Sequence, residues 1–173
     1  MKTLIIYGSQ YGSTKRYANR LSEITGIEAI DYKVAKNISE YERIIYLGAL
    51  YASGVTGLKK TVSKIIPNQE LVIVTVGLAD PADSENVKSI RKSIKSQIPL
   101  EFYDESKIYH LRGAIDYSQL GLKHKVMMSL LHSKVSKMPE SELNAEAKAM
   151  LETYGKQVDF IDFNTLEKIA SQF

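Results

Sequence analysis

The sequence contains no cysteine. Disulfide frameworks, thiolate zinc sites, thiolate-ligated iron–sulfur clusters and cysteine nucleophiles are therefore excluded. Long apolar runs are missing as well. The first residues, MKTLIIYGSQ, hold one lysine and a short apolar stretch before glycine and polar residues. This stretch is too brief for a signal peptide and far short of the roughly 20 residues that span a bilayer, so we expect a soluble, cytoplasmic protein.

A large excess of charge of one sign is also absent. The chain has 23 Lys and Arg residues against 20 Asp and Glu residues, a net charge of +3. No basic stripe with interleaved aromatic residues is present, so nucleic-acid binding is not expected. Metal-ligand spacing is missing too, because His124 and His132 have no acidic neighbour within a helical turn. We expect these two histidines and His110 to be surface or partly buried side chains.

Short β-rich segments alternate with segments of helical periodicity along most of the chain. The apolar spacing predicts strands at residues 2–7, 27–32, 43–50, 70–76 and 107–112, and helices at 13–25, 58–66, 87–98, 120–137, 142–154 and, capped by Asn164, near the C-terminus. Strands that alternate with helices through short connections form a parallel sheet with helices on both faces. We therefore expect an α/β doubly wound fold.

No repeat, low-complexity tract or Pro/Gly linker divides the 173 residues. Residues 1–173 are therefore predicted to form a single domain. The least regular part is the segment from about residue 112 to residue 139, which is compatible with an insertion or a flexible lid.

Ligands of open parallel sheets bind beyond the carboxyl ends of the strands. The loop after the first predicted strand consists of Ser9, Gln10, Tyr11, Gly12, Ser13 and Thr14. Backbone amides at a helix N-terminus bind anions, the serine and threonine hydroxyls add donors, and no acid in the loop repels a phosphate. A second interpretation is that Ser and Thr cap the helix and Gly turns the chain. This stretch alone leaves both interpretations open.

Other phosphate-binding motifs do not fit this loop. The loop has neither the glycine spacing nor the third glycine of the dinucleotide motif G-x-G-x-x-G. The Gly-Lys-Ser/Thr of nucleotide-triphosphate loops is absent from the sequence. A receiver domain that is phosphorylated on aspartate needs acids after the first and third strands. Gly8-Ser9 and Leu50-Tyr51 stand at those positions.

The loop resembles the phosphate loop of the flavodoxin family, whose pattern is roughly Ser/Thr-x-Thr-Gly-x-Thr. Ser9, Gly12 and Thr14 match this pattern, and Tyr11 stands in place of the middle threonine. The resemblance extends over most of the chain, because the order of strands and helices also agrees. It implies a flavodoxin-like five-stranded parallel sheet of order 2-1-3-4-5 and FMN as the cofactor.

The resemblance also implies that two further loops flank the flavin ring. By position they consist of Ala49, Leu50, Tyr51, Ala52, Ser53 and Gly54 after the third strand, and of Gly77, Leu78, Ala79 and Asp80 after the fourth. Such loops stack on a flat ring and present backbone groups to its polar edge. Tyr51 is either the stacking residue or an ordinary surface tyrosine. Asp80 either influences the charge of the flavin or serves the turn beside Pro81.

A narrower resemblance lies in the C-terminal third. The segment RGAIDY at 112–117, the Lys-, Met- and Leu-rich helix that follows it, and FIDF at 160–163 are similar to the flavodoxin-type, quinone-dependent protoporphyrinogen oxidases of bacteria. This resemblance implies an enzyme in which FMN passes electrons from a porphyrinogen to a quinone.

Three function classes follow from these observations. The first is an FMN-binding redox protein that transfers electrons to or from a partner protein, and the alternative is an oxidase that acts on a small molecule and a quinone. A flavin-free interaction module is disfavoured, because a scaffold has no need for a row of inward hydroxyls. No catalytic residue is assigned.

The stretch 120–138 combines lysines with leucine, valine and methionine. This pattern is compatible with a helix that lies on an anionic membrane and gives access to a quinone. More often it is the pattern of a packed helix with solvated lysines.

Overall fold

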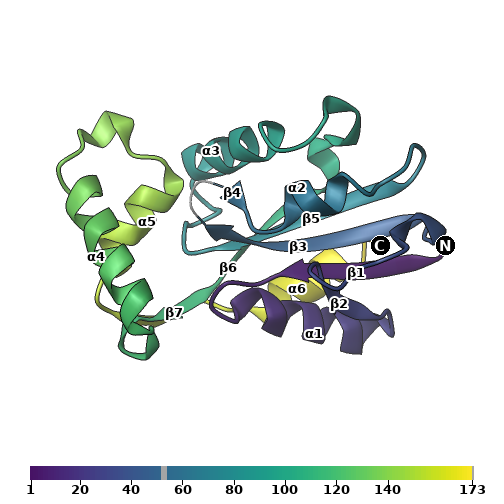
Figure 1. Ribbon diagram of the computed structural model, residues 1–173, viewed down its shortest axis with the longest axis horizontal. Coiled ribbons are helices and arrows are strands. Elements are labelled where there is room, and N and C mark those ends of the chain that lie inside the picture. The colour runs from purple at the N-terminus through teal and green to yellow at the C-terminus, as the bar shows by residue number, and fades with distance from the viewer. Residues whose placement is uncertain (52–53, 173) are drawn as a thin grey trace.

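The computed structural model describes residues 1–51 and 54–172. Its central sheet contains β1 (Thr3–Gly8), β2 (Ala29–Asp31), β3 (Arg43–Tyr51), β5 (Glu70–Gly77) and β6 (Ile108–Arg112). These strands are parallel and lie in the order β2-β1-β3-β5-β6 (Figure 1). The short β4 (Gly54–Val55) pairs with the end of β3 in antiparallel fashion. With β4 set aside, this is the predicted order 2-1-3-4-5, which is confirmed.

Helices cover both faces of the sheet (Figure 1). Successive residues of a strand point to opposite faces. Leu4 and Ile6 therefore join the core under α2 (Leu58–Val62) and α3 (Ser84–Lys95), whereas Ile5 joins the core under α1 (Ser13–Thr25) and α6 (Phe163–Ala170). Burial on both faces explains the near-continuous apolar runs of the strands.

A second, smaller group of elements lies at one end of the molecule, away from the N-terminus (Figure 1). It contains the antiparallel ribbon of β7 (Ala114–Asp116) and β8 (Gln157–Asp159), together with α4 (Leu122–Val135) and α5 (Ala145–Thr153). These elements have an apolar core of their own, formed by Ile115, Tyr117, Leu120, Met128 and Met150. The segment 112–139 thus includes β7 and α4. The 3-10 helices of the chain are Ile38–Glu40, Leu100–Phe102, Glu105–Lys107, Tyr117–Gln119 and Glu140–Glu142.

Several helix ends differ from the prediction. The last helix is capped by Asp162 and not by Asn164, because the Asp162 carboxylate accepts hydrogen bonds from the Asn164 amide at 2.9 Å and the Thr165 hydroxyl at 2.6 Å. Asp83 likewise caps α3 by accepting from the Glu85 amide. The helix after β4 ends at Val62, earlier than the apolar spacing predicts.

Two features of the fold determine where a ligand can bind. The first is the register, which pairs Gly8 with Gly48, Ala49 with Val76, and Gly77 with Arg112, so that β1, β3, β5 and β6 end at one edge. The second is the placement of α4 and α5 beyond the same edge. No helix in the part of the chain that the structure describes is long and apolar enough to cross a membrane.

Candidate functional site

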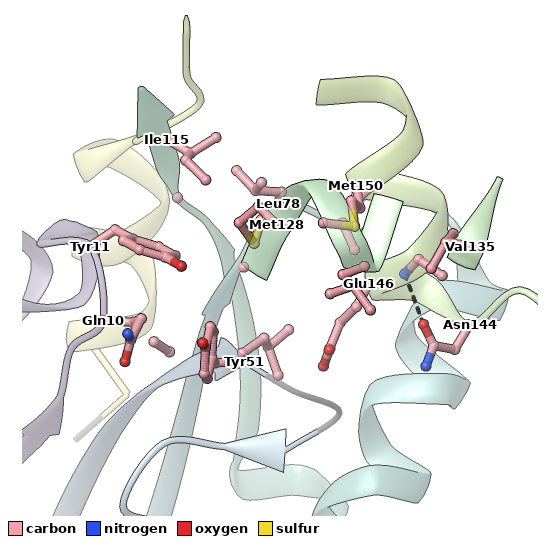
Figure 2. A pocket seen from close by; sticks show the side chains of 18 of the residues that line it. Gln10, Tyr11, Tyr51, Leu78, Ile115, Met128, Val135, Asn144, Glu146 and Met150 are labelled. Carbon is pink, nitrogen blue, oxygen red and sulfur yellow. Dashed lines mark hydrogen bonds between the residues drawn. The ribbon is translucent and has the colours of Figure 1, made fainter. Parts of the chain in front are cut away.

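A cavity of about 370 Å³ lies between the carboxyl edge of the sheet and the pair α4 and α5 (Figure 2). Many residues of the predicted site line it, namely Gln10, Tyr11, Ser13, Thr14, Ala49, Leu50, Tyr51, Gly77, Leu78 and Ala79. The lining does not include Ser9, Gly12, Gly54 or Asp80. Ala52 and Ser53 lie outside the described residues. All three predicted loops therefore contribute to one cavity.

The loop between β1 and α1 directs backbone amides toward a single oxygen. Gly12 precedes the helix with φ 98°, a left-handed conformation that glycine adopts without strain. The amides of Gly12 and Lys15 both donate to Ser9 Oγ, at 3.2 Å and 3.4 Å. Both amides are thus bonded to Ser9, at the positive end of the α1 dipole, where an anion is stabilised.

The Ser13 hydroxyl is bonded to the backbone of β7 and is not free to bind a phosphate. Its Oγ accepts a hydrogen bond from the Ala114 amide at 2.8 Å and donates to the Ala114 carbonyl at 3.1 Å. This pair of bonds ties the first turn of α1 to β7. Thr14, the next residue, is only 1% exposed and still lines the cavity.

Tyr11 and Tyr51 lie near each other on one side of the cavity (Figure 2). Its ring meets Tyr51 edge-on, with centroids 6.2 Å apart, and meets His124 of α4 edge-on at 5.7 Å. Burial raises the pKa of Tyr11 to about 12, with a further contribution from Tyr51. The buried hydroxyls of Tyr11 and Tyr117 have no hydrogen-bond partner among the described residues.

Tyr51 is half-buried and connects the loop after β3 to the helical wall of the cavity. Its hydroxyl donates to Met127 Sδ at 3.1 Å. Tyr51 thus contacts α4, and its stacking on a flavin ring stays a prediction. The ring borders the same cavity as Tyr11 and Leu78 (Figure 2).

Arg112 holds the loop after β5. Its Nε and Nη2 atoms donate to the Leu78 carbonyl at 3.2 Å and 2.9 Å, and its guanidinium stacks over Phe160 at 3.7 Å. Asp80 lies in the turn that follows, where its carboxylate accepts from the Ala82 amide at 2.9 Å. Of the two interpretations of Asp80, the turn is the one that these contacts support.

The opposite wall of the cavity is not among the residues predicted from the sequence. Four of the five methionines of the chain line it, namely Met127, Met128, Met138 and Met150. Figure 2 shows Met150 and Val135 across the cavity from Tyr11. Methionine adapts its shape to apolar ligands, so the clustering of this residue between positions 127 and 150 was the signal available in the sequence.

The three histidines contact different parts of the chain. Within residues 1–51 and 54–172, no group of at least three His, Asp or Glu side chains is placed to hold a metal ion. His110 Nδ1 lies 2.7 Å from Thr75 Oγ1, and burial lowers the pKa of His110 to about 4, helped by the positive charge of Arg91. His132 stacks on Tyr154 at 3.9 Å.

The cavity combines features that suit one kind of ligand. The N-terminus of α1 at one end suits a phosphate, an apolar middle suits a flat ring, and two unpartnered phenol hydroxyls suit the polar edge of such a ring. The residues present therefore fit FMN, the cofactor that the resemblance implies.

Comparison with known proteins gives one family and several similar folds. The model of the flavodoxin domain family matches residues 4–142. No curated protein matches the sequence. Oxidised flavodoxin 2 from Bacillus cereus is similar over 100% of both chains, with 10% identity and a TM-score of 0.48. The flavodoxin of Fusobacterium nucleatum, solved with flavin mononucleotide bound, is 16% identical with a TM-score of 0.45, over 67% of this chain and 80% of that chain.

Proposed function

Because the chain belongs to the flavodoxin domain family, we propose that it binds FMN in the cavity at the carboxyl edge of the sheet and transfers electrons through the bound flavin. One observation carries the proposal: an acid-free loop at the N-terminus of α1 lines, through Gln10, Tyr11, Ser13 and Thr14, the same apolar cavity as two unpartnered phenol hydroxyls. When bound, FMN supplies one- or two-electron chemistry.

In this proposal, different residues bind the phosphate and the ring of FMN. The amides of Gly12 and Lys15 and the hydroxyls of Ser9 and Thr14 hold the phosphate, since they lie at the N-terminus of α1. Tyr51 supplies an aromatic face for the ring, as in the prediction.

The cavity wall sets the conditions for electron transfer. Leu78 and the methionines of α4 and α5 keep water from the ring, and a low local dielectric strengthens the hydrogen bonds that reach it. The hydroxyls of Tyr11 and Tyr117 are the donors available to the polar edge of the ring.

An absorption spectrum, recorded after addition of FMN and removal of the excess, tests the proposal. Retained oxidised-flavin bands with quenched fluorescence are the expected result. A protein that stays colourless would remove the redox function, leave the fold standing, and favour an interaction module.

A double substitution tests the phosphate loop. Ser9→Ala with Thr14→Val removes two hydroxyls of the loop, and we expect FMN affinity to fall by about tenfold or more, because hydrogen bonds to charged groups contribute about 1.5–3 kcal/mol each. Ser22→Ala with Thr25→Val is the matched control at the other end of α1. Equal FMN affinity in the parent and the Ser9/Thr14 variant in a fluorescence titration would show that the phosphate-loop assignment is wrong.

A second candidate function is the oxidation of a reduced porphyrin-like ring with a quinone as electron acceptor. The observation that favours it is that the lining of the cavity continues beyond the three loops to Met138 and Met150. An assay with a porphyrinogen and a quinone, run beside an assay coupled to a flavodoxin reductase, distinguishes the two. Turnover without a partner protein supports the oxidase, and turnover only with the reductase supports the carrier.

A further inference from the structure

Helix α4 carries apolar residues on two opposite faces. One face packs inward, where Met128 and Val135 are buried. The other face is open to solvent: Leu122 is 79% exposed, Val126 is 53% exposed and Leu130 is 69% exposed. A solvated helix face normally carries polar residues, so the exposed face needs an explanation beyond packing.

The exposed apolar residues form a continuous stripe. Leu122, Val126 and Leu130 follow one another at steps of four residues, and each step advances only about 40° around a helix of 3.6 residues per turn. The three side chains therefore lie one above the other. We call them the apolar stripe; none of them lines the cavity.

Lysines accompany the apolar stripe along α4, and the helix itself carries no carboxylate. The helix and the turn after it carry Lys123, Lys125, Lys134 and Lys137, and no Asp or Glu stands between Asp116 and Glu140. None of these lysines forms an ion pair with another described residue. Lys125 donates to the Ser118 carbonyl at 2.9 Å. The helix that carries the stripe therefore has only positive formal charge. Of the carboxylates near it, Asp116 interacts with Lys125, and Glu142 and Glu146 line the cavity on the inward side.

We propose that α4 docks on the surface of an anionic lipid bilayer, with the apolar stripe inserted among the acyl chains and the flanking lysines at the headgroups. Lysine stems cover apolar surface while the ammonium group stays at the level of the charged headgroups. The helix lies on the bilayer and does not span it, in agreement with the absence of a spanning helix among the described residues.

A second copy of this chain fits the apolar stripe less well than a bilayer does. A symmetric dimer would bring the same four lysines of each copy face to face, at a cost in like-charge repulsion. A stable protein interface also needs about 800 Å² from each partner, whereas the stripe offers only three apolar side chains. An anionic lipid surface matches both the narrow stripe and its charge.

Docking through α4 would bring the cavity close to the bilayer. The inward face of the same helix supplies Met127, Met128 and Leu131 to the cavity wall. The helix is thus a single layer between the proposed flavin site and the lipid surface. This inference does not depend on FMN, because the stripe and the cavity-lining residues are different side chains.

Vesicle sedimentation with the full chain tests the proposal. We expect binding to vesicles of phosphatidylcholine with phosphatidylglycerol, and weak binding to phosphatidylcholine alone. Leu122→Ser with Val126→Ser and Leu130→Ser should reduce binding to the anionic vesicles by about tenfold or more. Lys123→Gln with Lys137→Gln should weaken binding at low salt and flatten its dependence on salt.

The matched control replaces three exposed apolar residues elsewhere, Val34, Ile66 and Leu100, with serine. This variant should bind anionic vesicles as the parent does, and circular dichroism establishes that all variants are folded. The proposal is overturned if the parent does not bind anionic vesicles, if it binds neutral vesicles equally well, or if the control loses as much binding as the stripe variant. A parent dimer that dissociates in the stripe variant, with unchanged vesicle binding, would assign the stripe to a second copy instead.

Discussion

The hydroxyl of Tyr11 is buried beside Tyr51 and His124 and has no hydrogen-bond partner among the described residues. A buried polar group without a partner costs about 1–3 kcal/mol. The ligand-free protein carries this cost, and a ligand that offers an acceptor removes it. We therefore expect this hydroxyl to lower the stability of the ligand-free protein and to raise its affinity for FMN.

Tyr11→Phe separates these two effects. We expect the free energy of unfolding of the ligand-free protein to stay equal or rise by up to about 1 kcal/mol, and FMN affinity to fall about fivefold. Urea unfolding without ligand and a fluorescence titration with FMN give the two values. Tyr103→Phe is the control, because the Tyr103 hydroxyl donates to Glu105 and Tyr103 does not line the cavity. Loss of stability with unchanged affinity would mean that the Tyr11 hydroxyl serves the fold and not the ligand.

His110 makes the free energy of unfolding depend on pH. Its pKa is lowered to about 4 in the folded chain by burial and by Arg91, whereas an unfolded histidine has a pKa of about 6.5. Between these values the unfolded chain binds a proton that the folded chain does not, so the free energy of unfolding falls as the pH is lowered from about 6.5 to about 4.

His110→Gln should remove this loss, which is about 1–3 kcal/mol. Urea unfolding at several pH values in this range measures it. An equally steep loss of stability in the variant would attribute the acid sensitivity to other groups.

At the scale of elements, α1 and β7 are held together by one side chain. Ser13 Oγ accepts from the Ala114 amide and donates to the Ala114 carbonyl. Without this hydroxyl, two backbone groups at the junction of the phosphate loop and the second group of elements lose their partner. The hydroxyl therefore positions the loop relative to the helical wall of the cavity.

Ser13→Ala should lower the free energy of unfolding by about 1–3 kcal/mol and weaken FMN binding, because the first turn of α1 is no longer fixed. Ser96→Ala is a suitable control, since Ser96 is exposed and its hydroxyl donates to the Ser93 carbonyl at the end of α3. Thermal unfolding with and without FMN tests both parts. A variant with parental stability would show that water replaces the Ser13 hydroxyl at no cost.

The elements differ in how far the sequence predicts them. The bounds of α1 are predicted as observed, because Gly12 and Gly26 stop the apolar periodicity at both ends. β8 is missed, since it has three residues and pairs only with β7. The same limit applies to the site: the three loops follow from strand order, whereas the methionine wall depends on the packing of α4 against Tyr11 and of α5 against α3, which no local pattern encodes.

At the scale of the whole molecule, two groups of elements meet at one cavity. The sheet edge supplies the polar loop, and α4 and α5 supply the apolar wall. A ligand that touches both stabilises the whole fold, because it binds the folded chain and not the unfolded one. At a concentration about 100 times its Kd, such a ligand adds about 2.7 kcal/mol to the free energy of unfolding.

A comparison of FMN with riboflavin, which lacks the phosphate, distinguishes the contribution of the loop after β1 from that of the apolar wall. We expect FMN to raise the unfolding midpoint more than riboflavin does at equal concentration, because only FMN reaches the amides of Gly12 and Lys15. In the Ser9→Ala, Thr14→Val variant the difference between the two ligands should shrink, while the smaller shift with riboflavin stays. Equal shifts with both ligands in the parent would mean that the loop after β1 holds no phosphate and that the apolar wall alone recognises the ring. A shift with neither ligand would reject the flavin site, and would leave vesicle binding by α4 as an independent property of the chain.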